Sequence, residues 1–247
     1  MEYYYTEPEN VNIESKLLSI EGYEYRHVVK VLRKKQDDII NITDGLRNIY
    51  VCKIVNILRD SVLCEIIESK YNLNEPKVKL RLFVSPLRNN DRFEFLIEKA
   101  VELGVYEIQP VISKYTIQQA TFSKTKMERM QKIIISAMGQ SQRCYLPTIH
   151  NTMTLNDMIF KSEKYINRIV YYEFAEFKEG IITKLDNDEN ICIFTGPEGG
   201  FDRSEIQQLI KNGWQVRSLG ERKLRAETAA IISVFENLNN FNRKELL

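Results

Sequence analysis

Cysteine and histidine are scarce in this chain of 247 residues, which holds four cysteines and two histidines. The cysteines show no paired spacing and stand mostly in apolar stretches, as the reduced core thiols of a cytosolic protein do. With so few imidazoles and no clustered thiols, the sequence argues against a zinc site. We therefore expect a cytoplasmic protein that uses no metal.

Long hydrophobic runs are also missing. No stretch is long and apolar enough to cross a membrane, and the opening Met1–Tyr5 lacks the basic and then apolar character of a signal peptide. Hydrophobic residues still make up 43% of the composition, which is enough to bury the core of one or two domains. The sequence thus predicts a globular protein without a membrane partner.

The overall charge is close to neutral, at +1, so it indicates no general affinity for nucleic acid. Basic residues nevertheless gather in two places. Five of them and no acid lie between Glu24 and Asp37, and five lie from Lys124 to Arg143 against the single acid Glu128. Such local patches are typical of docking onto a phosphate backbone, although a solvated helix face explains either patch alone equally well.

A glycine-bearing loop near the carboxy terminus carries the clearest functional signal. Ile191–Thr195 predicts a buried strand and Gly196–Gly200 a loop, while Asp202 and Glu205 predict the capping box of the next helix. Glycines let backbone N–H groups approach a ligand. The loop fits neither the phosphate-loop nor the dinucleotide pattern, and its carboxylate, Glu198, favours a positively charged ligand. The alternative is a tight turn that binds nothing.

A second strand breaks at glycine a short way further on. Trp214–Leu219 predicts this strand and Gly220–Arg225 a basic loop. A helix over 226–239 follows, and its expected interior face holds Ala229, Ala230, Ile232, Ser233 and Leu238. In open α/β sheets, loops that leave the carboxyl ends of strands form the ligand crevice. Two such loops close together in sequence therefore predict one shared binding site.

The rest of the chain divides at a polar, proline-ended linker, 69–76. Before the linker, apolar runs predict a small β domain, with a helix over 23–34 that carries basic residues. The runs are 38–43, 49–57 and 61–68. After it, predicted strands alternate with helices, which is the pattern of a parallel sheet with both faces covered. These strands are 78–85, 105–113 and 166–172, and a long helix is expected over 124–138.

The sequence predicts both ends of one helix in this second part. Asn90-Asp91 with Glu94 predicts a capping box at its start, and Gly104 predicts its end. Its apolar residues recur at helical spacing and predict a buried stripe of Phe93, Leu96, Ile97, Ala100 and Val101.

The two glycine loops carry motifs that resemble a known enzyme family. Gly196-Pro-Glu-Gly-Gly200, Leu219-Gly220 and Leu224-Arg225-Ala-Glu-Thr-Ala229 are similar to the C-terminal signature of the bacterial ribosomal RNA small subunit methyltransferase E family. That family belongs to the SPOUT class and has a trefoil knot. Three further segments match in the same order, namely His27–Arg33, Glu94–Val105 and Gln140–Arg143. One departure is Ala226, where the family often has Thr.

The resemblance implies a fold class and a division of labour. Residues 1–72 would form a PUA-like β-barrel that binds RNA. Residues 77–247 would form an α/β SPOUT methyltransferase domain with a parallel sheet and a C-terminal trefoil knot. The implied RNA-binding residues are Lys30, Arg33, Arg92 and Arg143. We interpret His27 as a hydrogen-bonded structural histidine. Like most SPOUT enzymes, the chain would form a homodimer.

The resemblance also implies the reaction. S-adenosyl-L-methionine would give its methyl group to N3 of a specific uridine in 16S rRNA of the small ribosomal subunit. The residues implied to hold this cofactor are Thr195, Gly196, Pro197, Glu198, Gly199, Gly200, Ser218, Leu219, Gly220 and Leu224.

Arg225 is the candidate catalytic residue. Negative charge grows on the uracil carbonyl oxygens as the N3 proton leaves, and a cation at the mouth of the second loop would stabilise that charge. The alternative role for Arg225 is an ion pair with Glu227 or Glu198. Those two carboxylates are also candidates to accept the proton. Two other functions stay open at this point, namely methylation of a different RNA, such as a transfer RNA ribose, and RNA binding without catalysis.

Overall fold

The computed structural model describes residues 2–117, 121–175 and 190–243. The chain forms two compact units. The first consists of Met1–Glu75 with Ile135–Leu146, and the second of Pro76–Ile134 with Pro147–Leu247. Among the described residues, none of the helices has the length and hydrophobicity that crossing a membrane requires.

The first unit is built on a six-stranded sheet with the strand order β1-β4-β5-β6-β3-β2. β1 (Tyr3–Tyr5) runs parallel to β4 (Ile39–Thr43). The remaining neighbours are antiparallel, and they are β5 (Asn48–Ile57), β6 (Ser61–Tyr71), β3 (Leu17–Glu21) and β2 (Val11–Asn12). Alternate residues of β4, β5 and β6 fill one core, in which Ile40, Ile42, Cys52, Ile54, Val62 and Cys64 are buried. This alternation is the reason the three strands were predictable from the sequence.

Short helical segments connect these strands. η1 (Pro8–Asn10) is a single 3₁₀ turn, and α1 (Gly22–Arg26) continues into the π-helical turn η2 (His27–Val31). The predicted helix at 23–34 therefore exists, but it ends earlier. The Nε2 atom of His27 lies 3.1 Å from Oε1 of Glu2, which agrees with a hydrogen-bonded structural histidine.

Within the first unit, a buried ion pair joins Glu75 to Arg143. Glu75 Oε2 is 2.8 Å from Nη2 of Arg143, and both side chains are at least 97% covered, with exposures of 2% and 3%. The backbone N–H groups of Cys144 and Tyr145 each donate to Glu75 Oε1 over 2.9 Å. One carboxylate therefore fastens the segment 135–146 to the rest of this unit.

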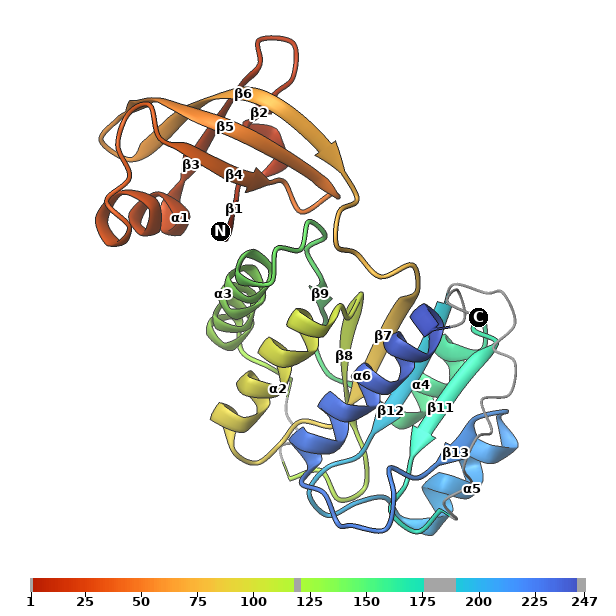
Figure 1. Ribbon diagram of the computed structural model, residues 1–247. Helices are drawn as coiled ribbons and strands as arrows, with labels where there is room; N and C mark the ends of the chain where they lie inside the picture. Colours follow the sequence, from red (N-terminus) through yellow and green to blue (C-terminus); the bar gives the residue numbers. More distant parts are fainter. Residues whose placement is uncertain (1, 118–120, 176–189, 244–247) are drawn as a thin grey trace. The chain divides into compact units, whose positions relative to one another are not determined.

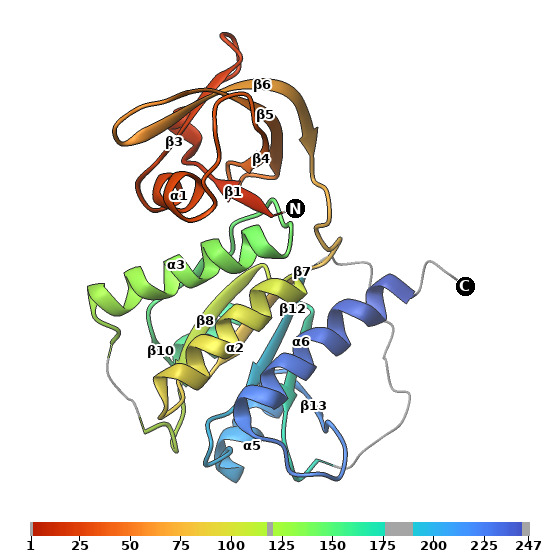
Figure 2. The same cartoon turned by 60° about the vertical axis from the view of Figure 1, so that its left-hand side comes forward.

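The second unit contains a parallel sheet with the strand order β10-β8-β7-β12-β11-β13, and β9 pairs with β8 (Figures 1 and 2). The strands are β7 (Lys79–Val84), β8 (Glu107–Ile112), β9 (Thr148–Ile149), β10 (Met153–Thr154), β11 (Asn167–Tyr171), β12 (Asn190–Thr195) and β13 (Gln215–Arg217). β12 lies between β7 and β11 and is buried over almost its whole length. Burial on both faces is why its sequence is a continuous apolar run instead of an alternating one.

Helices cover both faces of this sheet. α2 (Asn90–Leu103) and α6 (Ala226–Arg243) lie side by side on one face (Figures 1 and 2). α4 (Leu155–Ser162) and α5 (Arg203–Lys211) pack against the strands through a core that includes Phe83, Phe194, Leu209 and Trp214. α3 (Lys124–Gln140) is the longest predicted helix of this region and begins at its expected residue. The predicted buried stripe of α2 is confirmed.

Three local predictions need correction. Asn89 caps α2, because its side chain accepts from the N–H of Arg92, whereas the sequence pointed to the next two residues. Glu94 completes no capping box there and instead pairs with Arg129 at 2.7 Å. Ile232 was assigned to the interior face of α6 but is 39% exposed, while Ala230 and Ser233 are fully buried.

Two helix ends agree with the sequence. Asp202 and Glu205 form the capping box of α5, and Gly104 ends α2 with a φ of 111°. A side chain at Gly104 would be strained by that dihedral and would also collide with Pro76.

Candidate active site

The ends of three parallel strands meet at one edge of the second unit's sheet. In the registered pairs, Tyr171 of β11 lies opposite both Thr195 of β12 and Arg217 of β13. All three strands point the same way, so the loops that follow them leave the sheet at the same edge. This topology brings the glycine loop after β12 next to the loop after β13.

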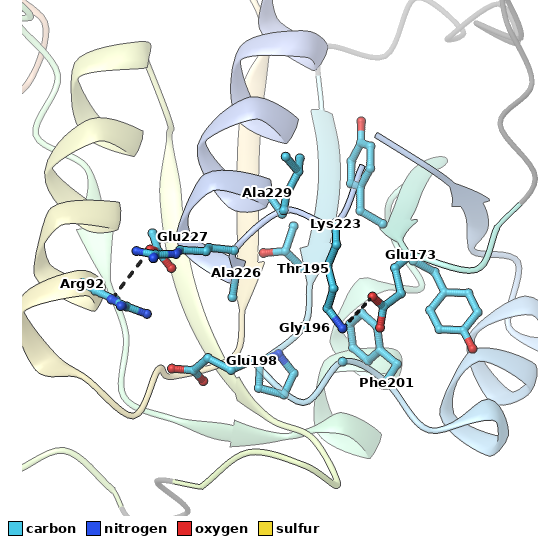
Figure 3. A pocket seen from close by; sticks show the side chains of 16 residues that line it. Arg92, Glu173, Thr195, Gly196, Glu198, Phe201, Lys223, Ala226, Glu227 and Ala229 are labelled. Carbon is cyan, nitrogen blue, oxygen red and sulfur yellow. Dashed lines mark ion pairs between the residues drawn. The ribbon is translucent and has the colours of Figure 1, made fainter. Parts of the chain in front are cut away.

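A cavity of about 390 Å³ opens between these loops (Figure 3). Its walls come from the ends of β11 and β12, from the segment before α6, from the first turn of α6 and from α2. The lining residues used below are Arg92, Glu173, Thr195, Glu198, Arg225 and Glu227. A second cavity of about 340 Å³ shares Tyr171, Glu173, Lys223 and Leu224 with the first and adds Ser218, Leu219 and Gly220. The two loops thus border one hollow, made of two cavities that share part of their walls.

The loop after β12 is a tight turn. Gly200 has a φ of 72°, which favours glycine, and its N–H donates to the carbonyl of Pro197 over 2.9 Å. Phe201 then turns back onto Phe194, with ring centroids 4.8 Å apart. Its ring lies so close to Gly196 that a Cβ there would come within 2.9 Å of it. Backbone geometry and aromatic packing therefore set the shape of the loop.

Hydrogen bonds fix the base of the cavity. Asn237 Nδ2 donates to the hydroxyl of Tyr171 over 2.7 Å, and that hydroxyl donates to Glu236 Oε2 over 3.1 Å. Burial raises the pKa of Tyr171 above its usual range, with the Glu236 carboxylate as the next cause, so the phenol stays protonated. This network ties the end of β11 to α6.

Acidic and basic side chains around the cavity are mostly engaged with one another. Arg92 Nε lies 3.8 Å from Glu227 Oε1, and Lys223 Nζ lies 3.4 Å from Glu173 Oε2 (Figure 3). Glu198 Oε1 accepts from the backbone N–H of Arg88 over 2.9 Å. Neither Glu227 nor Glu198 pairs with Arg225, which is exposed at the cavity wall. Among the residues that the structure describes, Arg225 is therefore a cation of the cavity without an ion-pair partner.

Two buried polar atoms of the cavity lining lack a hydrogen-bond partner within the described part of the chain. They are Oγ1 of Thr195 and Oε2 of Glu227. Both residues are well covered, at 2% and 8% exposed. Buried polar atoms are normally satisfied, so these two atoms call for a hydrogen bond from a bound molecule or an ordered water.

Known RNA methyltransferases resemble this chain over most of its length. Residues 74–235 match an RNA methyltransferase domain, and residues 20–67 match an RNA methyltransferase PUA domain. The ribosomal RNA small subunit methyltransferase E of Mesomycoplasma hyopneumoniae is 36% identical over 204 residues, which cover 82% of this chain and 86% of that protein. The chain belongs to the ribosomal RNA small subunit methyltransferase E family. The Aquifex aeolicus member is 31% identical and is matched over its whole length by 98% of this chain.

Solved structures of similar proteins agree with this assignment. The family member from Neisseria gonorrhoeae, crystallised with bound S-adenosyl methionine, has a TM-score of 0.83 at 30% identity, and the match covers 95% of both chains. A methyltransferase from Legionella pneumophila in complex with the same cofactor has a TM-score of 0.81 at 26% identity and covers 94% of both chains. The predicted family, the PUA-like and SPOUT-type fold class and the RNA methyltransferase class are confirmed. The predicted cofactor is the molecule that both of these proteins hold. The trefoil knot stays a prediction.

The structure gathers most of the predicted cofactor residues of this family member in one place. Thr195, Gly196, Pro197, Glu198, Gly200 and Leu224 line the first cavity, and Ser218, Leu219, Gly220 and Leu224 line the second. Gly199 is placed differently, since it packs against Tyr115, and a Cβ there would come within 2.9 Å of the Tyr115 Cβ. Arg225, the predicted catalytic residue, lines the first cavity. That these residues bind the cofactor stays a prediction.

The predicted RNA-binding residues are scattered. Lys30 and Arg33 are exposed in the first unit, on and just after η2. Arg92 lines the first cavity and pairs with Glu227, and its contact with RNA stays a prediction. Arg143 is only 2% exposed. Because its guanidinium is enclosed with Glu75, the structure assigns Arg143 to internal packing, and the predicted phosphate contact there is corrected.

Sequence reasoning missed the contribution of β11. Tyr171, Tyr172 and Glu173 line both cavities, and they stand at the end of a strand that had been predicted at 166–172. The rule that pointed to the loops after β12 and β13 applies equally to this strand end. Tyr171, Tyr172 and Glu173 carry no glycine motif, so only their position at a strand end could have marked them as cavity residues.

Proposed function

We propose that this chain transfers a methyl group from S-adenosyl-L-methionine to N3 of a specific uridine in 16S rRNA of the small ribosomal subunit. The observation that carries the proposal is the hollow formed by the two glycine-broken loops in a chain of the ribosomal RNA small subunit methyltransferase E family. A cytoplasmic location follows from this substrate.

The residues around the hollow fit the cofactor. Tyr171, Phe201, Leu224 and Ala229 offer apolar surface for an adenine ring. Backbone groups of Thr195–Gly200 and Ser218–Leu224 can hold adenosine between them, and the unsatisfied Oγ1 of Thr195 offers a further hydrogen bond. When bound, S-adenosylmethionine supplies an electrophilic methyl group on a positively charged sulfur. The protein's main task is then alignment of the two reacting groups.

Arg225 has the position to assist the acceptor base. It lines the cavity beside the first turn of α6, and no ion pair to Glu198 or Glu227 occupies it. As the N3–H bond of uracil breaks, negative charge develops on the flanking carbonyl oxygens, and a guanidinium donor stabilises it. N3 lies on the pairing edge of the base, so the target uridine must enter unpaired or flipped out of its helix.

Lys30 and Arg33 of the first unit are exposed, and we propose that they bind the RNA backbone. We expect Lys30→Ala and Arg33→Ala each to weaken RNA binding and to reduce the slope of log affinity against log salt concentration by about one. Filter binding over a salt series measures this slope. Lys211→Ala, at an exposed lysine of α5, serves as the control. Unchanged slopes for both variants would remove the two residues from the RNA contact.

A homodimer is proposed on the strength of α6. This helix exposes Ile232 and Phe235 at 39% and 54%, one turn apart, so an apolar strip faces outward. Such a strip suits an isologous contact with a second copy of the chain. Sedimentation of the purified protein measures its oligomeric state, and a monomer at high concentration would contradict the proposed homodimer.

Nucleoside mass analysis tests the proposed reaction. Small ribosomal subunits from a strain that lacks this enzyme are incubated with the protein and methyl-labelled S-adenosylmethionine, and the rRNA is digested to nucleosides. We expect the label in N3-methyluridine. Label in a ribose-methylated nucleoside would indicate the other RNA methylation, and cofactor uptake without label transfer would indicate an RNA-binding role alone.

A further inference from the structure

Glu227 has one carboxylate oxygen that nothing in the described fold uses. The residue stands in the first turn of α6, two positions after Arg225, and its side chain lines the cavity while the residue is only 8% exposed. Oε1 faces Nε of Arg92 at 3.8 Å. Oε2 is buried and has no hydrogen-bond partner among the described residues. A buried acceptor left in this state costs free energy unless a bound molecule donates to it.

Two features beside Glu227 carry positive charge. The first turn of a helix carries positive partial charge, and the Arg92 guanidinium lies on the other side. An ionised carboxylate can only accept hydrogen bonds. Any partner of Oε2 must therefore be an N–H or O–H group.

The pairing edge of uracil matches the two side chains that face the cavity here. That edge presents a carbonyl acceptor next to the N3–H donor, and it needs a donor next to an acceptor in return. Arg225 can supply the donor, and the Glu227 carboxylate can supply the acceptor. The other carboxylates of the lining are engaged, Glu198 with the N–H of Arg88 and Glu173 with Lys223.

We propose that Glu227 accepts the N3 proton of the target uridine. The inference rests on the proposed function and adds the missing proton acceptor to it. The Glu227 carboxylate first holds the N3–H group by a hydrogen bond and then takes the proton as the N3–H electron pair forms the new N3–C bond. The sulfur–methyl bond breaks in the same event, and its electron pair stays on sulfur. The proton on Glu227 passes to water after the product leaves, which restores the carboxylate.

Glu227→Gln tests this role, because the amide keeps the shape of the side chain and cannot take the proton. We expect single-turnover methylation at neutral pH to fall on the order of a hundredfold. Affinities for S-adenosylmethionine and for RNA, measured by calorimetry and filter binding, should stay within about twofold of the unchanged protein. Glu98→Gln removes a carboxylate from α2, where it pairs with Lys99 outside the cavity lining, and is the matched control.

Two further readouts separate proton transfer from a structural role. The variant's rate should rise with pH as N3 ionises in solvent, whereas the rate of the unchanged protein should rise less steeply over the same pH range. RNA that carries 5-fluorouridine at the target has a more acidic N3–H and should restore a large part of the lost rate. Equal losses at every pH with no rescue would overturn the proposal. So would a rate equal to that of the unchanged protein, or a loss confined to cofactor affinity.

Failure of this inference and failure of the proposed function give different results. If the unchanged protein forms no N3-methyluridine, the proposed function fails. If it forms N3-methyluridine and Glu227→Gln keeps the full rate, only the role of Glu227 fails.

Discussion

Replacing Arg225 by Ala should lower the turnover of rRNA methylation by roughly ten- to a thousandfold, while S-adenosylmethionine should still bind. The size of the loss is that expected for one donor that stabilises developing negative charge in a site shielded from water. Cofactor binding should survive because adenosine is proposed to be held by the apolar residues of the cavity and by the loop backbones. The guanidinium has no part in that contact. Single-turnover methylation and calorimetric titration with the cofactor measure the two quantities separately.

Arg203→Ala is the control for this result, since Arg203 is an exposed arginine at the start of α5 and lies outside both cavity linings. It should leave the rate and the affinity unchanged. If Arg225→Ala turned over at the rate of the unchanged protein, Arg225 would have no part in the mechanism. If the variant lost cofactor affinity in proportion to its rate, the arginine would bind the cofactor and not the transition state.

Replacing Glu75 by Ala has the largest expected effect on stability. The change leaves the Arg143 guanidinium buried without its counter-charge, and it removes the acceptor of the Cys144 and Tyr145 N–H groups. Loss of one member of a buried ion pair costs about 3–5 kcal/mol. We expect the free energy of unfolding of the first unit to fall by that amount in urea titrations followed by circular dichroism.

A surface pair provides the comparison. Glu68 Oε2 lies 3.2 Å from Lys70 Nζ, but the two side chains are 55% and 42% exposed. Solvent screening limits such pairs to less than about 1 kcal/mol, so Glu68→Ala should barely shift the unfolding midpoint. Equal, small losses in both variants would show that the Glu75–Arg143 pair contributes little to the fold. Arg143→Ala should behave as Glu75→Ala does, through stability and not through RNA affinity.

Features set by neighbouring residues were predictable from the sequence. The capping box of α5 depends on two residues three positions apart, and the buried stripe of α2 depends on helical spacing. The buried run of β12 and the glycines after it define a strand end and its loop without any distant information. Because parallel strands end at the same edge, the sequence also predicted that the two loops would lie together at one cavity.

Features set by distant partners were not predictable. Arg143 belongs to a basic run, and nothing near it in sequence reveals that Glu75, 68 residues earlier, encloses it. Arg92 likewise meets Glu227 only because α2 and α6 lie together. The exposure of Ile232 depends on which face of α6 meets the sheet, and helical spacing alone left more than one choice. The sequence thus shows which segments carry charged residues, but the ion-pair partner of each residue is known only from the fold.

Amide hydrogen exchange with and without S-adenosylmethionine tests the central claim most directly. If the loops after β12 and β13 clasp the cofactor together, exchange should slow in both 196–200 and 218–225 on addition of the cofactor, to a similar degree. Protection of one loop alone, or of neither while the cofactor binds elsewhere, would contradict a site shared by the two loops.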